Sequence, residues 1–324
     1  MTRAATQPGI TLRISVTDRC DIRCRHCLPA EGVTELLDRS DILGFEEITR
    51  VVQAVTAVAP SVALRITGGE PLLRRDIDRL VRMLSDLETG DLALTTNGRL
   101  LADLAPRLTD AGLRRVNISL DTLRPERYAY LTRGASLNNT LAGIEAALAS
   151  DLNPVKLNAV VLRGINDDEV CSLVRFAAER GSQMRFIELM PIGEATARHG
   201  EWFVPTAEVR GRLKQEFEIG EQLPDTPAPA RTFRGRCRET GLSGIVGFIS
   251  PVGHPFCDGC RRLRLTSWGE LLGCLMHGSG LDVRSILRSG APDAQLEDAV
   301  RSALALKAAG HRAHRRASMA TVGG

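Results

Sequence analysis

The cysteines of this 324-residue sequence fall into two spaced groups, which we call the front triplet and the rear triplet. The front triplet comprises Cys20, Cys24 and Cys27, and the rear triplet comprises Cys257, Cys260 and Cys274. Cys171 and Cys237 stand apart, and we assign them no role. The first residues lack the apolar core of a secretion signal, and thiols stay reduced in the cytosol. The spacing therefore favours metal or redox chemistry over disulfides.

The front triplet has the spacing Cys20-x3-Cys24-x2-Cys27 and follows directly on an expected first strand. Three thiolates can hold a [4Fe-4S] cube and leave one iron without a protein ligand. Structural zinc is the alternative, but zinc needs a fourth ligand, and His26 lies between two of the cysteines. The spacing favours an iron-sulfur cluster with one open coordination position.

A turn with two glycines, at residues 67–71, closes the second expected strand. Glycines let a backbone approach a ligand closely, although such a pair in isolation is ordinary loop sequence. One strand after the front triplet, the turn resembles the motif that binds the S-adenosylmethionine (SAM) amine in radical SAM enzymes, and the triplet resembles their cluster loop. The resemblance implies SAM contacts at the matching positions, which are His26, Gly69, Ser119 and Met190.

The rear triplet has the spacing Cys257-x2-Cys260-x13-Cys274. Three thiolates again suit a [4Fe-4S] cube with an open iron. His254 and His277 lie near enough in sequence to complete a zinc site instead. Spacing alone leaves both alternatives open.

Two arginines that follow the rear triplet are candidates for binding phosphate. The period of two in a strand puts Arg262 and Arg264 on one face, where paired guanidinium groups suit a polyphosphate. The alternative is a solvated face of an arginine-rich protein. Lys156 lies in another expected strand, where a phosphate would satisfy a buried ammonium, unless its head group reaches solvent.

Together these motifs resemble the MoaA family of GTP 3′,8-cyclases, which start molybdenum cofactor biosynthesis. The resemblance spans nearly the whole chain through residues 12–20, 65–71, 95–98, 117–121 and 185–190, the rear triplet and the terminal Gly323-Gly324. It implies two [4Fe-4S] clusters, with SAM at the front cluster and the guanine end of GTP at the rear cluster. The implied GTP contacts are Arg13, Arg65, Thr96, Lys156, Arg262, Leu263 and Arg264.

The reaction that the resemblance implies is that of a radical SAM lyase. A 5′-deoxyadenosyl radical abstracts hydrogen from C3′ of the GTP ribose, and attack on guanine C8 gives (8S)-3′,8-cyclo-7,8-dihydroguanosine 5′-triphosphate. Catalytic roles are implied for Gly323-Gly324, as a finger that enters the site, and for Arg185. The implied partners are an electron donor of reductase or flavodoxin type, the cyclic pyranopterin monophosphate synthase MoaC as recipient of the product, and a second copy of the chain in a homodimer.

Strand-like and helix-like segments alternate through the first two-thirds of the chain. Strands are expected at residues 10–16, 62–67, 91–95, 115–120, 155–162 and 184–189, and helices at 48–58, 77–87, 137–148 and 170–178. Gly112 and Gly181 sit where helices should end, and residues 166–168 can cap the last of these helices. The alternation predicts an α/β fold with a partial (β/α)6 TIM-like barrel. No GxGxxG motif follows the first strand, which disfavours a dinucleotide-binding sheet.

The alternation of strand-like and helix-like segments stops after Met190. Residues 191–230 are rich in proline and resemble a connection, with an irregular stretch at 194–202. Short strands at 245–249, 263–266 and 270–273 surround the rear triplet, and residues 281–306 look helical. We expect a radical SAM barrel at residues 1–225 and a smaller C-terminal domain at 226–324 that carries the second cluster and binds substrate.

Composition excludes several classes of protein. The 43% apolar and 25% charged residues fit a globular chain, and no run approaches the roughly 18 apolar residues of a membrane span, so we expect a cytoplasmic protein. The net charge is only +3, and the 42 basic residues include three lysines. An arginine bias this general does not indicate a nucleic-acid partner.

Two other functions remain as alternatives. A radical SAM peptide maturase with an auxiliary cluster would share the front half but should lack the Arg262 and Arg264 pair and the Gly-Gly end. A non-enzymatic, zinc-stabilised nucleic-acid module would explain the rear triplet and the basic residues Arg312, Arg315 and Arg316. It would leave the glycine turn and the barrel unexplained.

Overall fold

The computed structural model describes residues 9–33, 36–87, 89–224, 229–255, 257, 260–275 and 280–308. Their strands form one twelve-stranded sheet in the order β12-β11-β10-β1-β2-β3-β4-β5-β6-β9-β8-β7. The strands are β1 Ile10–Ser15, β2 Val62–Thr67, β3 Asp91–Thr96, β4 Arg115–Ser119, β5 Val155–Val161, β6 Gln183–Glu188, β7 Phe217–Gln222, β8 Arg231–Cys237, β9 Ser243–Ile249, β10 Arg262–Leu265, β11 Glu270–Leu272 and β12 Leu281–Asp282.

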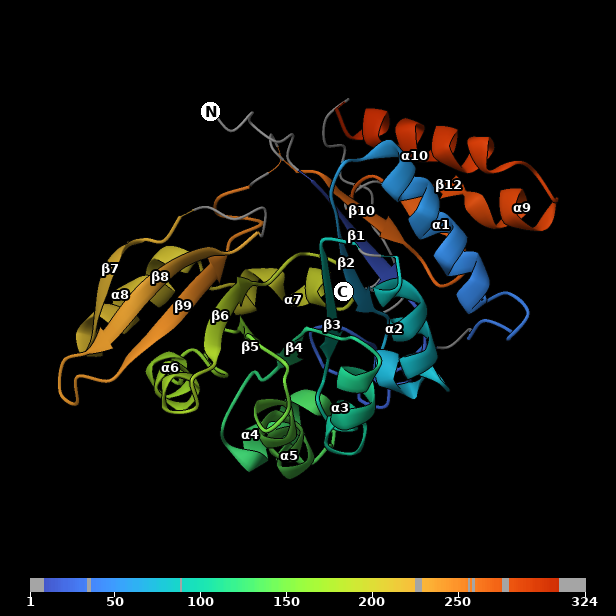
Figure 1. The fold of residues 1–324 in the computed structure, drawn as a ribbon. Helices are drawn as coiled ribbons and strands as arrows, with labels where there is room; N and C mark the ends of the chain where they lie inside the picture. The colour runs from blue at the N-terminus through green and yellow to red at the C-terminus, as the bar shows by residue number, and fades with distance from the viewer. Residues whose placement is uncertain are drawn as a thin grey trace, which may run out of the picture.

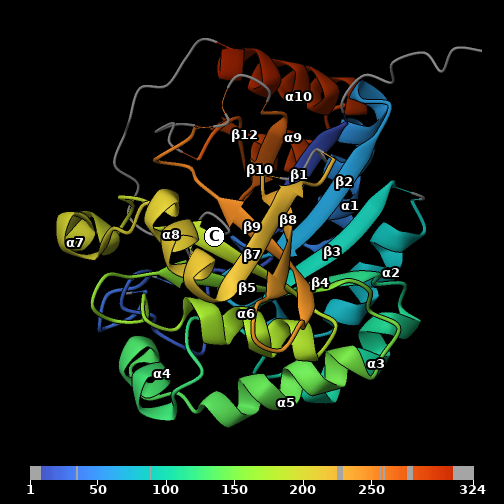
Figure 2. The same cartoon turned by 90° about the vertical axis from the view of Figure 1, so that its left-hand side faces the viewer.

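Helices connect most of the strands. They are α1 Phe45–Val58, α2 Ile77–Ser85, α3 Leu101–Asp110, α4 Pro125–Thr132, α5 Leu137–Leu148, α6 Val170–Glu179, α7 Ala195–Trp202, α8 Thr206–Glu216, α9 Val283–Arg288 and α10 Asp293–Ala308, with a short 3-10 helix at Pro71–Leu73. Strands β1 to β6 lie in chain order and pair in parallel with their neighbours. The sheet curves, and α1 to α6 lie along its outer side (Figures 1 and 2). The predicted partial (β/α)6 barrel is confirmed.

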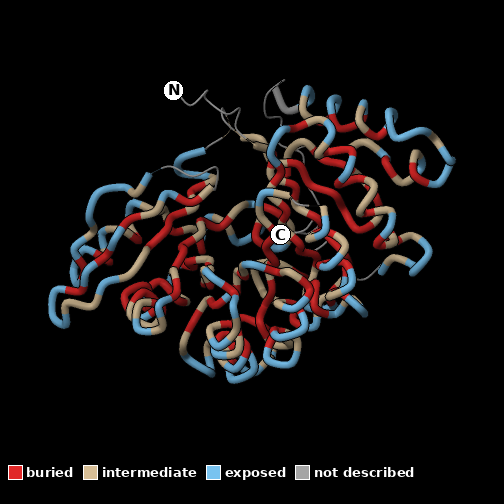
Figure 3. The backbone as a smooth tube through the Cα atoms, in the orientation of Figure 1, coloured by how far each residue is buried: buried red, intermediate tan, exposed pale blue. Residues whose placement is uncertain are grey.

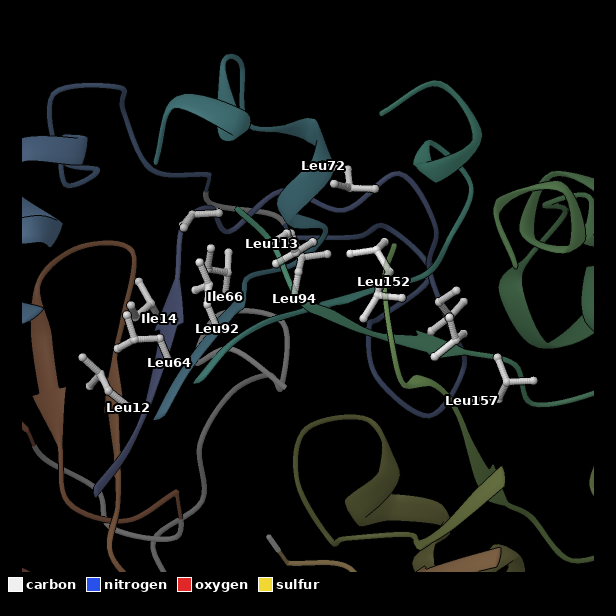
Figure 4. Packing of buried hydrophobic residues seen from close by; sticks show 14 of the residues in the cluster. Leu12, Ile14, Leu64, Ile66, Leu72, Leu92, Leu94, Leu113, Leu152 and Leu157 are labelled. Carbon is white, nitrogen blue, oxygen red and sulfur yellow. The ribbon is translucent and has the colours of Figure 1, made fainter. Parts of the chain in front are cut away.

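The hydrophobic core lies between the outer face of the sheet and these helices. Alternate strand residues, such as Leu12, Ile14 and Leu64, are fully buried in one cluster with the helices (Figures 3 and 4). Because side chains alternate along a strand, the intervening residues, which include Arg13 and Arg65, face the inner side of the curved sheet. We call this inner side the lumen.

The strands that surround the rear triplet extend the barrel sheet at both of its edges. Strand β10 runs parallel to β1, and β11 and β12 continue beyond it. At the other edge β9 runs parallel to β6 and begins an antiparallel extension with β8 and β7. Helix α10 packs on α1 (Figure 1). All twelve described strands therefore share one sheet, and the functional division at residue 225 stays a prediction.

The expected connection at 191–230 is wrong over most of its length. Its described residues include helices α7 and α8 and strand β7. Trp202, Val209 and Leu213 are buried and attach these elements to the rest of the molecule. Pro205 sits at the N-cap of α8, where a proline does not interrupt helical hydrogen bonding, so the proline content misled the sequence reading.

The expected helix at 281–306 is also wrong as a single element. Strand β12 takes its first two residues, and α9 and α10 are separated by Gly290, whose φ is +74°. Glycine tolerates this left-handed conformation, which breaks the helical path. Gly112 and Gly181 have φ of +99° and +65° and follow the ends of α3 and α6, as predicted.

Residues 166–168 do not cap α6, whose N-cap is Glu169. The side chain of Asn166 instead accepts from the N–H of Leu162 at 2.7 Å and donates to the carbonyl of Asp121 at 2.7 Å. It therefore joins the ends of neighbouring strands rather than starting the helix. Across the described parts of the chain, each helix is too short or too polar to cross a bilayer.

Candidate active site in the barrel lumen

The two cysteine triplets lie at opposite ends of the barrel. Cys20 follows the carboxyl end of β1. Strand β10 runs parallel to β1 and starts at Arg262, so Cys260, two residues earlier, lies at the amino end. Strand β11 runs antiparallel to β10 and returns the chain to that end just before Cys274. The lumen therefore lies between the triplets.

The glycine turn after β2 binds directly to the front loop, which we define as residues 16–28. The N–H of Gly69 donates to the carbonyl of Thr17 at 2.8 Å, and the N–H of Glu70 donates to the carbonyl of Arg19 at 2.7 Å. A Cβ on Gly69 would lie 2.3 Å from the Arg19 oxygen. The glycine is required because two backbones meet here, a reason that sequence reading did not identify.

Glu70 joins the ends of β2 and β3 behind the front loop. It is buried, and its carboxylate accepts from the N–H of Leu72 at 3.0 Å, the hydroxyl of Thr96 at 2.7 Å and the N–H of Asn97 at 2.7 Å. Burial raises its pKa to about 7. The Asn97 amide in turn donates to Asp21 at 2.7 Å, next to Cys20 in sequence. This network fixes the near side of the front loop.

Arg133, which follows α4, holds the far side of the front loop. Its Nη1 donates to the carbonyls of Arg23 and Leu28, each at 2.7 Å. Between those residues, the N–H of Cys27 donates to the carbonyl of Cys24 at 2.8 Å and forms one tight turn. Two of the three thiols are thus presented by a single turn that is anchored at both ends.

The donor set of the front loop fits a [4Fe-4S] cluster. Burial raises the pKa of Cys20 to about 12 and that of Cys24 well above its ordinary value, so these thiols ionise readily only when a metal replaces the proton. Two thiolates on one zinc ion lie about 3.8 Å apart, from a 2.3 Å bond and tetrahedral geometry. No group of three His, Cys, Asp or Glu side chains in the described ranges is arranged for a single ion. Three thiols presented by one loop suit a cube with one open iron.

His26 faces an acidic side chain at the carboxyl end of β4. Its Nε2 lies 3.9 Å from a carboxylate oxygen of Asp121, a half-buried residue just beyond β4. Burial raises the pKa of Asp121, and the facing imidazole opposes that effect. Asp121 also accepts from the N–H of Val160 at 2.9 Å. The pair places the imidazole beside the front loop, at the mouth of the lumen.

A row of cationic side chains crosses the lumen between the two triplets. Arg13 of β1 stands in register between Arg264 of β10 and Arg65 of β2. Burial, followed by repulsion from Arg262 and Arg65, lowers the pKa of Arg13 to about 10. Burial and neighbouring arginines lower the pKa of Lys156 to about 7. Closely spaced like charges that are partly shielded from water favour a polyanionic ligand.

Asp91 and Arg115 complete the amino end of this row, and sequence reading missed both. Arg115 Nε donates to Asp91 at 2.8 Å, and Arg65 also pairs with Asp91. Asp91 is the first residue of β3 and Arg115 is the first residue of β4, and both lie on the lumen face. Alternation from Asn117, two residues along β4, could have placed Arg115 there. The abundance of arginine concealed that signal.

Two buried polar atoms of the lumen have no hydrogen-bond partner within the described structure. They are Nε of Arg185 and Oδ1 of Asn158, which stand in register on β6 and β5. Burial lowers the pKa of Arg185 to about 10, with repulsion from Arg115 and Arg65 as smaller causes. Buried polar groups are normally satisfied, so these atoms mark a place for a polar ligand.

The predicted arginines of β10 approach the rear triplet. Arg262 Nε donates to the sulfur of Cys260 at 3.2 Å. Arg264 is buried, and its pKa is lowered well below the usual value by burial and by Arg13 and Arg262. Leu263 points to the opposite face and packs in the core, so any ligand contact from it is limited to the main chain.

The remaining predicted residues lie at the carboxyl end or outside the described ranges. Ser119 is exposed at the end of β4, and Met190 follows β6 and packs against Ile192, Leu272 and Leu275. Gly323 and Gly324 lie outside the described residues, as does His277.

Comparison with known proteins agrees with this arrangement. Residues 14–177 match the model of the radical SAM superfamily, and residues 182–313 match that of Molybdenum Cofactor Synthesis C. A GTP 3′,8-cyclase of Moorella thermoacetica is 46% identical over 303 residues, which cover 93% of this chain and 91% of the relative. One from Rhodopseudomonas palustris strain TIE-1 is 44% identical over 317 residues, with 95% and 90% coverage.

A solved structure shares the fold. SuiB of Streptococcus suis, bound to S-adenosylmethionine, aligns with a TM-score of 0.61 and 17% identity over 91% of this chain and 68% of its own. The fold and the match over residues 14–177 define a radical SAM enzyme, with SAM and iron-sulfur clusters as cofactors. Within that superfamily, the chain belongs to the family of GTP 3′,8-cyclases.

Proposed function

We propose that this chain converts GTP to (8S)-3′,8-cyclo-7,8-dihydroguanosine 5′-triphosphate, the first step of molybdenum cofactor biosynthesis. The observation that supports the proposal most is the row of largely shielded cations between two cysteine triplets. A nucleoside triphosphate would supply negative charge to Arg13 and Lys156, and further charge to Arg65, which already pairs with Asp91. In this proposal the substrate lies between the two cluster sites.

At the carboxyl end, the front triplet holds the first [4Fe-4S] cluster in this proposal. SAM binds there through the residues that match the family's contacts, which are His26, Gly69, Ser119 and Met190. Bound together, cluster and SAM supply the radical chemistry. The chain supplies position: Glu70 and Arg133 hold the loop from two sides, and the curved sheet encloses the reacting groups.

At the amino end, the rear triplet holds the second cluster, and GTP lies with its guanine toward it. The phosphate chain contacts the lumen cations, and the proposed GTP-binding set is Arg13, Arg65, Thr96, Lys156, Arg262, Leu263 and Arg264. Because strands β1, β2, β3, β5 and β10 carry these residues, the sheet itself fixes their spacing. Arg185, with its unsatisfied Nε, is proposed as a catalytic residue that contacts the substrate in the same space.

Several partners belong to the same proposal. An electron donor of reductase or flavodoxin type reduces the front cluster, and the product passes to the cyclic pyranopterin monophosphate synthase. The chain works in the cytoplasm as a homodimer. Gly323-Gly324 acts as a finger that enters the lumen, because residues without side chains fit a crowded cavity and arginines attract the terminal carboxylate.

Anaerobic incubation of the reconstituted protein with SAM, GTP and a reductant tests the function. Mass spectrometry should detect the cyclised triphosphate together with 5′-deoxyadenosine. Replacement of Cys171, which lies outside both triplets, should leave the product yield unchanged. Formation of 5′-deoxyadenosine with GTP recovered intact would overturn the assignment of substrate while leaving the radical SAM class in place.

A further inference from the structure

Arg115 and Asp91 face the lumen, but neither is among the GTP-binding residues proposed above. Arg115 Nε donates to Oδ1 of Asp91 at 2.8 Å, and its Nη2 approaches Oδ2. Arg65 pairs with the same carboxylate from the neighbouring strand. The side chains of Arg115 and Asp91 are 24% and 26% exposed, so the pair is mostly shielded from water. One carboxylate thus holds two guanidinium groups in fixed directions.

The register of the sheet places one small residue between the backbone positions of Arg65 and Arg115. Arg65 of β2 stands opposite Ala93 of β3, and Ala93 stands opposite Arg115 of β4. The methyl group of Ala93 is the only side chain that β3 places at that level on the lumen face. The two arginines therefore flank a small residue rather than a bulky one, an arrangement that suits a ligand with several negatively charged oxygens.

Charge also places Arg115 with the proposed phosphate-binding residues. After burial, the causes that lower the pKa of Lys156 are Arg185, Arg115 and Arg65, while Asp91 opposes them. Arg115 and Arg65 are likewise the charges that lower the pKa of Arg185. The four cations Lys156, Arg185, Arg115 and Arg65 thus repel one another, and Asp91 is the acidic group among them. Their mutual repulsion decreases when a polyphosphate binds.

We propose that Arg115 is a further phosphate-binding residue, which contacts the GTP phosphate chain, and that Asp91 is the positioning residue that orients Arg115. A guanidinium has five N–H donors. Asp91 accepts from the single N–H of Nε and from one N–H of Nη2, which leaves both N–H groups of Nη1 for phosphate oxygens. The proposal rests on the proposed function, because it assigns a contact to the same substrate.

Equilibrium binding of GTP, GDP, GMP and guanosine to the anaerobically reconstituted holoenzyme tests the proposal. Arg115→Ala should weaken GTP binding about 10- to 100-fold, as expected for a charge-assisted contact, and guanosine binding less than about twofold. Arg107→Ala is the matched control, because Arg107 pairs with Asp78 on the outer helices and should change neither affinity.

The outcomes separate this proposal from the function itself. Normal GTP binding by the Arg115→Ala variant, or equal losses for GTP and guanosine, would overturn the phosphate contact while the function stands. Failure of the unmodified holoenzyme to bind GTP would remove both. If Asp91 positions Arg115, the loss of GTP affinity caused by Arg115→Ala should be smaller in an Asp91→Asn background. Additive losses of GTP affinity from the two substitutions would contradict the positioning role.

Discussion

The hydroxyl of Thr96 donates a hydrogen bond to Oε1 of Glu70 at 2.7 Å, and this contact joins the ends of β2 and β3 behind the front loop. Glu70 is 1% exposed, so water does not supply its hydrogen bonds. The other donors to its carboxylate are the backbone N–H groups of Leu72 and Asn97. Thr96, which the sequence suggested as a GTP contact, therefore has a structural partner as well. Because Thr96 follows the core residues Leu92 and Leu94 at the period of two along β3, its side chain lies on the face opposite the lumen, and its contact with GTP stays a prediction.

Replacement of Thr96 by Val should destabilise the protein by about 1 to 3 kcal/mol, because a buried carboxylate loses one of its donors. Urea unfolding of the wild-type and variant proteins measures the change. Thr109→Val is a suitable control, since Thr109 donates only to the Ala105 carbonyl of its own helix. If Thr96→Val lowers the free energy of unfolding no more than Thr109→Val does, the contact with Glu70 contributes little to stability.

Replacement of Gly69 by Ala should disturb the front loop specifically. The new Cβ would lie 2.3 Å from the carbonyl oxygen of Arg19, so one of the two backbones must move. We expect the iron content after reconstitution to fall from about eight to about four per chain, since only the rear cube assembles. Gly211→Ala, at a position with open space around it, should retain the full iron content. Full iron in both variants would contradict the tight fit.

Mutation should separate the tasks of the two cysteine triplets. Cys24→Ala should abolish SAM cleavage, whereas Cys260→Ala should retain some cleavage but form no cyclised product, because the triplets occupy opposite ends of the lumen. Chromatography of 5′-deoxyadenosine and of the nucleotide product measures both activities. If the two variants behave alike, the assignment of separate tasks to the triplets is wrong.

GTP binding should take up a proton through Lys156. Burial and the neighbouring Arg185, Arg115 and Arg65 lower its pKa to about 7, against the opposing charge of Asp91, so the free enzyme holds Lys156 mostly neutral at about pH 8. Phosphate favours the charged ammonium, and binding should restore it. At about pH 6 the lysine is already charged, and this uptake should vanish.

Calorimetry in buffers of different ionisation enthalpy measures the number of protons taken up. Lys156→Arg should bind GTP without the uptake at about pH 8, because an arginine stays charged throughout. Equal proton uptake by the wild-type and Lys156→Arg proteins would assign the proton to another group.

The alternation of strands and helices was sufficient to predict the barrel, since β2 and α5 occur at the predicted bounds. Periodicity identifies elements whose apolar face is buried on a common core. Helix α8 was missed because its sequence TAEVRGRLKQE buries only Val209 and Leu213, too few residues for a clear period. Its place is set by tertiary contacts, which one sequence does not display.

The cysteine triplets and the glycine turn were visible because their spacing is unusual, but the reason for the glycines was not. Only the folded chain shows that Gly69 contacts Arg19 rather than open solvent. Asp91 and Arg115 illustrate the same limit, because an ion pair between neighbouring strands depends on register. In a chain with 39 arginines among 42 basic residues, no single arginine stands out.

The central claim is that the lumen brings the ribose of GTP to the radical generated at the front cluster. GTP carrying deuterium at C3′, incubated anaerobically with the reconstituted enzyme, SAM and a reductant, tests it directly. Mass spectrometry of 5′-deoxyadenosine should show one deuterium acquired from the substrate, along with cyclised product. Unlabelled 5′-deoxyadenosine formed alongside that product would contradict the claim, because hydrogen would then have been taken from elsewhere.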